Sequence, residues 1–245
     1  MVALTDHDTT VGSAEASAAA ATHGIELVRG LEVSVEDAGQ GLHLLAYEPD
    51  PDDQDLRNMV ARTIEARDSR IPLMVEKIAA EIPALRLDDV LEIAGTAVLG
   101  RPHLADALVR TGAARDRRSA FAAYLAPGCP TYLETWSPPL DEAIGILQSA
   151  GGATVLAHSW GRGSHVTPER FRELKAVGLQ WVEVDHVEHD PEARRQLRQI
   201  ATDLDLVATG SSDYHGDRKP NRLGCETTAE EEYLWVSSLW VGSKG

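Results

Sequence analysis

Imidazole and carboxylate side chains recur along this sequence at or within short apolar runs. The set consists of Asp6, His7, Glu32, His43, His158, His186, Asp213 and His215. This mixture of nitrogen and oxygen donors suits zinc, manganese or iron. Two or more such ions together activate a water molecule and neutralise a phosphoryl oxygen. The pattern therefore indicates metal-assisted hydrolysis at a site assembled from several strands.

Each of these residues also has a structural interpretation. A single histidine at a strand end is more often a hydrogen-bonded structural residue, and Asp6 and Asp8 can simply cap the helix that follows them. Glu32 and His43 lie inside apolar strands, where an unpaired polar group is costly, so the metal interpretation is the better one for those two. Asp213-Tyr214-His215 is the strongest single motif, but the combination across strands carries the argument.

Apolar periodicity and turn residues predict the elements that position these side chains. Strands are predicted over 2–4, 26–28, 31–35, 42–47, 153–157, 179–184 and 206–209, and helices over 13–22, 141–149, 168–177 and 192–204. The run Val2–Leu4 is apolar enough to be expected inside a sheet, and Gly39-Gln40-Gly41 predicts a hairpin turn. The alternation predicts an α/β fold, which places ligands at the ends of its strands.

A segment of different character interrupts this alternation. Apolar residues recur at helical spacing from Met59 to Ile78, and Pro72 is expected to kink or divide that helix. Shorter helices are predicted over 87–94, 102–110 and 116–125, before a proline-rich linker over 127–139. The predicted organisation is a discontinuous core of residues 1–49 and 140–225, a helical insertion over 50–139 and a tail over 226–245.

Composition limits the classes of function. The chain has 245 residues and 43% apolar content, enough for one large core with an inserted subdomain. The formal charge of −16 argues against a broad nucleic-acid-binding surface, but not against a phosphate group held by metal ions. No apolar run approaches the ~18 residues that span a bilayer, and no signal peptide is visible. With only Cys129 and Cys225, a disulfide framework is excluded and a cytoplasmic protein is expected.

The order of the motifs resembles the polymerase and histidinol phosphatase (PHP) family of metal-dependent phosphoesterases. The matching segments are Ala3-Leu4-Thr5-Asp6-His7-Asp8-Thr9, Gly30-Leu31-Glu32, His43-Leu44-Leu45-Ala46-Tyr47, Arg101-Pro102-His103-Leu104-Ala105, Ala157-His158, Glu183-Val184-Asp185-His186 and Gly210-Ser211-Ser212-Asp213-Tyr214-His215-Gly216. The Arg-Pro-His motif in a helical insertion points to the stand-alone branch. Members of that branch resemble 3′,5′-nucleotide bisphosphatases acting on pAp-like substrates and 5′-to-3′ exoribonucleases trimming short RNA.

The resemblance implies a distorted (βα)7 barrel with a site for two or three divalent ions, namely Mn, Zn or Fe. The implied metal ligands are His7, Glu32, His43, His158, Asp213 and His215, with Glu32 as the bridge. The other implied roles are ligand orientation by Asp6 and Asp8, catalysis by His103 and His186, and phosphate contact by Arg101 and Arg162. One of the two catalytic histidines is expected to protonate the leaving oxygen. Arg162 fits a solvated loop equally well, and surface positions are expected for His23, His165 and His189.

The sequence departs from the family pattern before His7. Family members begin with a strand that carries His-x-His, followed by an Asp, and these supply three of the usual nine ligands; no histidine precedes His7 here. Three explanations stay open: a start upstream of Met1, a shortened chain, or a degenerate member with fewer ions. Because the later motifs are intact, a missing start is favoured. A second departure is Ser159, where the family often has proline.

The expected activity is hydrolysis of a phosphate ester on a small nucleotide or a short RNA end. The alternative is a degenerate family member that binds metal or phosphate with little catalysis. Neither a membrane partner nor a particular oligomeric state is indicated by the sequence.

Overall fold

The computed structural model describes residues 1–233 except 96, 98, 162, 217 and 218. The chain divides into two compact units, one formed by Met1–Asn58 with Pro138–Gly245 and the other by Met59–Ser137. The first unit contains the sheet and the second is helical. Among the described residues, no helix combines the length and the apolar character needed to cross a lipid bilayer.

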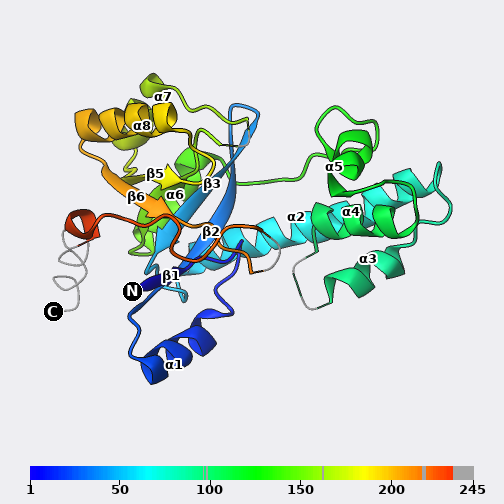
Figure 1. Ribbon diagram of the computed structural model, residues 1–245, viewed down its shortest axis with the longest axis horizontal. Coiled ribbons are helices and arrows are strands. Elements are labelled where there is room, and N and C mark those ends of the chain that lie inside the picture. Colours follow the sequence, from blue (N-terminus) through cyan, green and yellow to red (C-terminus); the bar gives the residue numbers. More distant parts are fainter. Residues whose placement is uncertain (96, 98, 162, 217–218, 234–245) are drawn as a thin grey trace. The chain divides into compact units, whose positions relative to one another are not determined.

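A six-stranded sheet forms the centre of the first unit, with its strands ordered as they occur in the sequence (Figure 1). The strands are β1 (Val2–Leu4), β2 (Leu27–Asp37), β3 (Gln40–Tyr47), β4 (Ala153–Ala157), β5 (Trp181–His186) and β6 (Val207–Ser211). β1 runs parallel to β2, and β4, β5 and β6 are parallel to one another. β3 is antiparallel to both of its neighbours. The predicted α/β class is confirmed, with a hairpin inside an otherwise parallel arrangement.

Two predictions about the strands differ from the structure. The predicted strands over 26–28 and 31–35 form one continuous strand, β2. Gly30 permits this because a Cβ atom there would lie 2.4 Å from the carbonyl oxygen of Ala46, so only glycine allows this close pairing with β3. β1 is not buried, since Ala3 is exposed. The physical reason is that β1 is an edge strand with β2 as its neighbour in the sheet.

The helices of the first unit pack beside the sheet, and local capping contacts stabilise helix ends. They are α1 (Ser13–His23), α6 (Leu140–Ser149), α7 (Pro168–Ala176) and α8 (Pro191–Leu204). α1 ends as predicted at Gly24, whose φ of 64° suits glycine. Asp190 caps the start of α8, because its carboxylate accepts a hydrogen bond from the Ala193 N–H at 2.8 Å. α6 contacts β2, β3 and β4, and its Ile144 and Leu147 are fully buried.

The second unit is built around the long helix α2 (Gln54–Ala79), which begins in the first unit. The other helices are α3 (Leu87–Ala94), α4 (Arg101–Arg110), α5 (Arg117–Ala120) and the π-helix η1 (Phe121–Leu125). Pro72 does not divide the helix, one of the two predicted outcomes, because α2 continues through it. Ile71 and Met74, on either side of the proline, are buried in the core of this unit, and that packing holds the helix together.

Candidate metal centre

The hairpin of β2 and β3 places Glu32 beside His43. Ser34 pairs with His43 across the hairpin, and Glu32 lies two residues before Ser34, so all three side chains share one face of the sheet. Glu32 Oε1 lies 2.7 Å from His43 Nδ1. Glu32 is 6% exposed, so this carboxylate is held away from bulk water.

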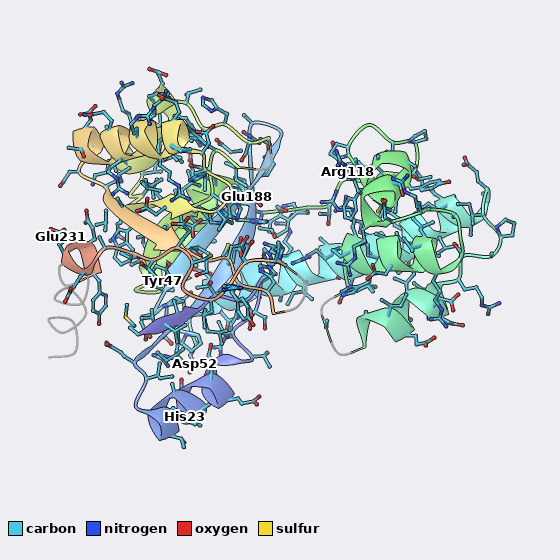
Figure 2. All side chains as sticks on the ribbon, viewed as in Figure 1. His23, Tyr47, Asp52, Arg118, Glu188 and Glu231 are labelled. Atoms are coloured by element: carbon cyan, nitrogen blue, oxygen red, sulfur yellow. The ribbon has the colours of Figure 1, made fainter. Side chains whose placement is uncertain are left out.

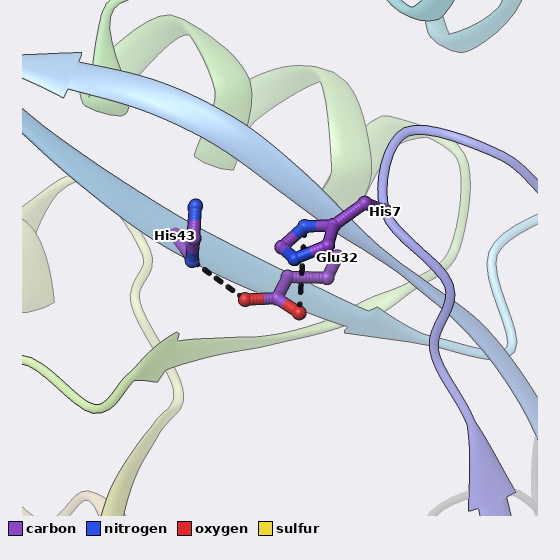
Figure 3. A group of neighbouring side chains, drawn as sticks. All are labelled: His7, Glu32 and His43. Atoms are coloured by element: carbon purple, nitrogen blue, oxygen red, sulfur yellow. Dashed lines mark ion pairs between the residues drawn. The ribbon is translucent and has the colours of Figure 1, made fainter. Parts of the chain in front are cut away.

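His7 reaches the same carboxylate from the segment after β1. The Glu32 N–H donates to the Asp6 carbonyl at 3.0 Å, and the Asp8 N–H donates to the Glu32 carbonyl at 2.9 Å. These two bonds fix residues 6–8 alongside β2. His7 Nδ1 lies 3.6 Å from Glu32 Oε2. Figure 3 shows the carboxylate between the two rings, with one oxygen toward His43 and the other toward His7.

His158 follows β4 and brings a third imidazole to Glu32. Ala157 pairs with His43, which sets the next residue beside that ring. His158 Nε2 lies 3.2 Å from Glu32 Oε1 and 3.2 Å from His43 Nδ1. The backbone of His158 has φ of 28°, in the region that favours glycine. Its N–H donates to Glu183 Oε2 at 2.7 Å, so Glu183 holds this unusual conformation.

The charges of this group favour an ionised Glu32. Burial acts to raise the pKa of Glu32, but the neighbouring His43 and His158, together with His7, outweigh it and hold the pKa well below its ordinary value. Glu183 differs, because burial dominates and raises its pKa. The surroundings therefore favour the anionic form of Glu32, whereas those of Glu183 shift its pKa in the opposite direction.

Asp213, after β6, forms a second group of potential ligands. Its Oδ1 lies 3.2 Å from His215 Nδ1, and its Oδ2 lies 3.6 Å from His186 Nε2 and forms an ion pair with Lys219. Burial acts to raise the pKa of Asp213, but the neighbouring His186 and Lys219, together with His215, outweigh it and lower the pKa. The His7 and His215 ring centroids are 6.1 Å apart, so the two groups adjoin.

The residues present fit a divalent ion. One ligand atom from each of His7, Glu32 and His43 lies within 4.8 Å of the others. The nitrogens of His43 and His158 approach the same oxygen and each other, an arrangement in which a shared cation satisfies all three groups. Among the described residues, Nε2 of the fully buried His186 lacks a hydrogen-bond partner, and Asp213 Oδ2 lies 3.6 Å from it. Imidazole nitrogens converging on an anionic carboxylate are the donor set of Zn, Mn or Fe sites.

Comparisons with known proteins identify the family. The chain is 32% identical over 225 residues to the 3′,5′-nucleoside bisphosphate phosphatase of Chromobacterium violaceum, covering 91% of this chain and 79% of that protein. A solved structure from Bifidobacterium adolescentis, described as a metal-dependent phosphoesterase, superposes with a TM-score of 0.88 at 37% identity and covers 96% of this chain and 84% of that one. The chain belongs to the PHP family of metal-dependent phosphoesterases.

Two further relatives agree with this assignment. The 5′-3′ exoribonuclease Rnm of Escherichia coli is 29% identical over 221 residues, covering 87% of this chain and 74% of that protein. A C. violaceum structure described as an amidohydrolase with bound sulfate and no metal has a TM-score of 0.81 at 32% identity and covers 91% of this chain and 79% of that one. A scan against protein-family models found no match. This PHP chain is thus a phosphoric ester hydrolase by family.

The two aspartates beside His7 in the PHP centre have different environments. Asp8 is fully buried, and its carboxylate accepts hydrogen bonds from the N–H of Ser34 at 2.9 Å and from its hydroxyl at 3.2 Å. Asp6 is exposed, and its carboxylate lies against Gly12 at the start of α1. The structure therefore joins Asp8 to the strand that carries Glu32, while the side chain of Asp6 faces the helix.

The remaining predicted site residues lie in the second unit or outside the described residues. His103 is buried on α4, and its Nδ1 accepts a hydrogen bond from the Gly100 N–H at 3.2 Å. Arg101 begins α4 and donates from Nη1 to the Leu125 carbonyl at 3.1 Å. Arg162 lies outside the described residues.

Residues that the sequence interpretation missed also support the PHP centre. Glu183 was not predicted as a site residue. Like Glu32, it is a carboxylate inside an apolar strand, and that pattern could have identified it. His189, expected on the surface, is 3% exposed, so that prediction is wrong. Its Nδ1 donates to the Val184 carbonyl at 3.0 Å, and Nε2 accepts from the Trp160 N–H, which draws the ring inward. His23 and His165 are exposed, as predicted; Figure 2 labels His23 at the end of α1.

Proposed function

We propose that this PHP chain hydrolyses a phosphate ester of a nucleotide at a centre of two or three divalent ions. The observation that carries the proposal is the buried Glu32 carboxylate, which three imidazoles contact from three different segments. Two of these imidazole nitrogens, on His43 and His158, also lie 3.2 Å from each other, and a cation shared with the carboxylate satisfies all of these groups within the buried site. A metal-dependent phosphoesterase requires such an arrangement, because these side chains hold its divalent ions.

The proposed ligands follow from the two adjoining groups. They are His7, Glu32, His43 and His158 in one group, and Asp213 and His215 in the other. When bound, divalent ions of this kind lower the pKa of water and neutralise charge on a phosphoryl oxygen. Glu32 uses both of its oxygens in contacts with histidines, which suits it to bridge two ions. Manganese, zinc and iron all fit these donors.

Surrounding residues hold the ligands in place. Glu183 fixes the backbone of His158, and Asp8 fixes the strand segment at Ser34. We assign His186 to the positioning of Asp213, because its ring is fully buried and faces that carboxylate. In the second unit, the Gly100 N–H bonded to Nδ1 of His103 fixes the proton of the neutral ring on Nε2. His103 stays the predicted proton donor, a role that requires the protonated imidazolium form of the ring.

The relatives support two substrates for the same chemistry. Their names specify a 3′,5′-nucleoside bisphosphate phosphatase and 5′-3′ exoribonucleases. We propose that this chain acts on a nucleotide 3′,5′-bisphosphate such as pAp or on the end of a short 5′-phosphorylated RNA. A cytoplasmic location suits both substrates, and Cys129 and Cys225 are free thiols, as expected in a reducing compartment.

A paired assay tests this function. The chain is stripped with chelator, reloaded with Mn²⁺, Zn²⁺ or Fe²⁺, and given pAp or a 5′-phosphorylated trinucleotide. Release of phosphate from pAp, or of mononucleotide from the RNA, is expected only after metal is restored. Turnover that is equally fast in chelator, or no turnover of either substrate with any of the ions, contradicts the proposal.

A further inference from the structure

An aromatic pair lies on the loop that follows β4. The indole of Trp160 and the imidazole of His165 stack, with their ring centroids 4.5 Å apart and an angle of 30° between their planes. Trp160 is half-buried, and its Nε1–H donates to the Val166 carbonyl at 2.8 Å. His165 is exposed, so the outer side of the stacked pair is open to solvent.

Contacts of this loop tie the pair to the metal centre. The Trp160 N–H donates to Nε2 of His189 at 3.4 Å. The ring centroids of His189 and His186 are 5.5 Å apart, and those of His186 and His158 are 5.2 Å apart. The Gly161 N–H also donates to the His158 carbonyl at 2.8 Å. The indole therefore follows a proposed metal ligand closely in the chain and is joined to the same group of histidines.

Close packing holds the described part of this loop in place. A Cβ atom at Gly161 would lie 3.1 Å from Glu188 Cβ and 3.3 Å from the His158 carbonyl oxygen, so glycine suits this close approach. The hydroxyl and the N–H of Ser164 both donate to the Gly161 carbonyl, at 2.5 and 2.9 Å. Val166, which accepts the indole bond, is 3% exposed. An aromatic surface that is already fixed loses little conformational entropy when a ligand covers it.

We infer that Trp160 and His165 form a stacking surface for the base of a nucleotide whose phosphate group lies at the metal centre. This role rests on the proposed function, because the metal centre brings the phosphate of the same nucleotide to this loop. Every nucleobase has a flat π-face, and stacking on an aromatic side chain is worth roughly 5- to 150-fold in affinity per base. The base continues the stack on the exposed side of His165.

The pair recognises the shape of a base rather than its identity. The indole N–H is already bonded to the Val166 carbonyl, so Trp160 offers a ring and no donor to a base. Stacking depends on ring area, which is larger for purines than for pyrimidines. We therefore expect purine nucleotides to bind more tightly than pyrimidine nucleotides, and both to bind more tightly than a sugar phosphate without a base.

Calorimetry with AMP and ribose 5-phosphate tests the inference without catalysis. The two compounds share a sugar and a 5′-phosphate and differ in the base, and AMP lacks the 3′-phosphate that pAp would lose. Both are titrated into the full chain, first in excess chelator and then with Mn²⁺. We expect the wild type to bind AMP at least ~10-fold more tightly than ribose 5-phosphate in one or both conditions. Equal affinities, or no measurable binding of AMP, in both conditions overturn the inference.

Variants of His165 separate stacking from a packing role. His165→Ala removes the outer ring, and we expect the AMP advantage to fall at least ~5-fold while ribose 5-phosphate binding and metal content stay unchanged. His165→Phe keeps a flat ring and should restore the advantage. His23→Ala, at another exposed histidine, is the matched control and should bind both compounds as the wild type does. If His165→Ala weakens both compounds equally, or leaves the AMP advantage intact, the inference fails.

The inner ring is tested by two variants of Trp160. Trp160→Phe keeps an aromatic support for His165, whereas Trp160→Leu keeps only apolar bulk at this half-buried position. We expect the AMP advantage to be at least ~5-fold larger in Trp160→Phe than in Trp160→Leu. Equal advantages in the two variants overturn the role of Trp160.

These binding results stand apart from hydrolysis. Base-dependent binding of AMP without turnover of pAp supports the stacking surface and contradicts the proposed function. Turnover of pAp together with equal binding of AMP and ribose 5-phosphate supports the proposed function and overturns the stacking surface.

Discussion

Glu32 and His43 face each other across the β2–β3 hairpin, with Oε1 of the carboxylate 2.7 Å from Nδ1 of the ring. The same oxygen lies 3.2 Å from Nε2 of His158, which β4 supplies. The hairpin register thus determines which imidazoles meet the carboxylate, because a shift by one residue turns His43 to the other face. The metal centre depends on strand pairing as much as on its ligands.

Replacement of Glu32 tests its role as a shared ligand. In Glu32→Gln, the amide keeps the size of the side chain but loses the charge that attracts a cation. We expect metal affinity to fall more than ~100-fold, beyond the loss that residues contacting a ligand produce. Metal content after dialysis, measured by mass spectrometry, checks this. Glu15→Gln on exposed α1 is the control and should retain its metal; full occupancy in Glu32→Gln would exclude Glu32 as a ligand.

Gly30 tests whether close strand pairing supports the centre. Gly30→Ala forces a Cβ atom to within 2.4 Å of the Ala46 carbonyl oxygen, whereas nothing lies within 4 Å of a Cβ at Gly41. We expect Gly30→Ala to lower the free energy of unfolding by ~1–3 kcal/mol and to weaken metal binding. Gly41→Ala, in the same hairpin, should change both quantities little. Chemical denaturation of the two variants makes the comparison, and equal stabilities would contradict it.

Asp8 and Asp6 form a natural pair of variants. Asp8→Ala leaves the half-buried Ser34 N–H without its acceptor, so we expect a loss of ~1–3 kcal/mol in the free energy of unfolding. The exposed Asp6→Ala should cost less than ~0.5 kcal/mol. Asp8→Asn keeps an acceptor oxygen and should fall between them. If thermal and urea unfolding rank Asp6→Ala as the most damaging variant, the assigned roles are reversed.

His189 should make stability depend on pH. Burial lowers its pKa below the ordinary value of 6.5, so the folded chain binds this proton less readily than the unfolded chain. The stability contributed by neutral His189 is therefore complete above pH 6.5 and is lost as the pH falls through the lower folded value.

Urea denaturation between pH 7.5 and 5 in chelator measures this effect. The wild type should lose stability on acidification faster than His189→Gln, by up to ~1.4 kcal/mol per pH unit. His189→Gln also loses the fixed hydrogen bond to Val184, which shifts its curve without changing the slope. The exposed His23→Gln should follow the wild type at every pH. Parallel curves for the wild type and His189→Gln would show that this proton is not linked to folding.

Local patterns in the sequence predicted much of the fold. Alternating apolar runs and turn glycines located the strands, and the signal at Gly24 placed the end of α1. Tertiary contacts decided the rest. Packing around Ile71 and Met74 carried α2 through Pro72, and the closeness of β2 to the Ala46 carbonyl joined two predicted strands through Gly30.

The residues of the site were likewise predictable only in part. Glu32 and His43 stood out because a polar residue inside an apolar strand requires a partner. The contacts that hold them depend on strand register and on loops that follow the strands. The hydrogen bond from the His158 N–H to Glu183 depends on how the strands pair, and so does the bond that holds His189 in its buried position. Neither can be predicted from the sequence of a single strand.

Phosphate release during a metal titration shows whether ions held by His43 and its neighbours hydrolyse pAp. Chelated wild type and His43→Ala receive increasing Mn²⁺, and bound ion and phosphate released from pAp are measured in the same samples. We expect wild-type turnover to rise in proportion to bound ion, and His43→Ala to bind less metal and to lose turnover with it. Turnover in the wild type without bound metal, or undiminished metal binding and turnover in His43→Ala, would contradict the assignment of this histidine–carboxylate cluster as the hydrolytic metal centre.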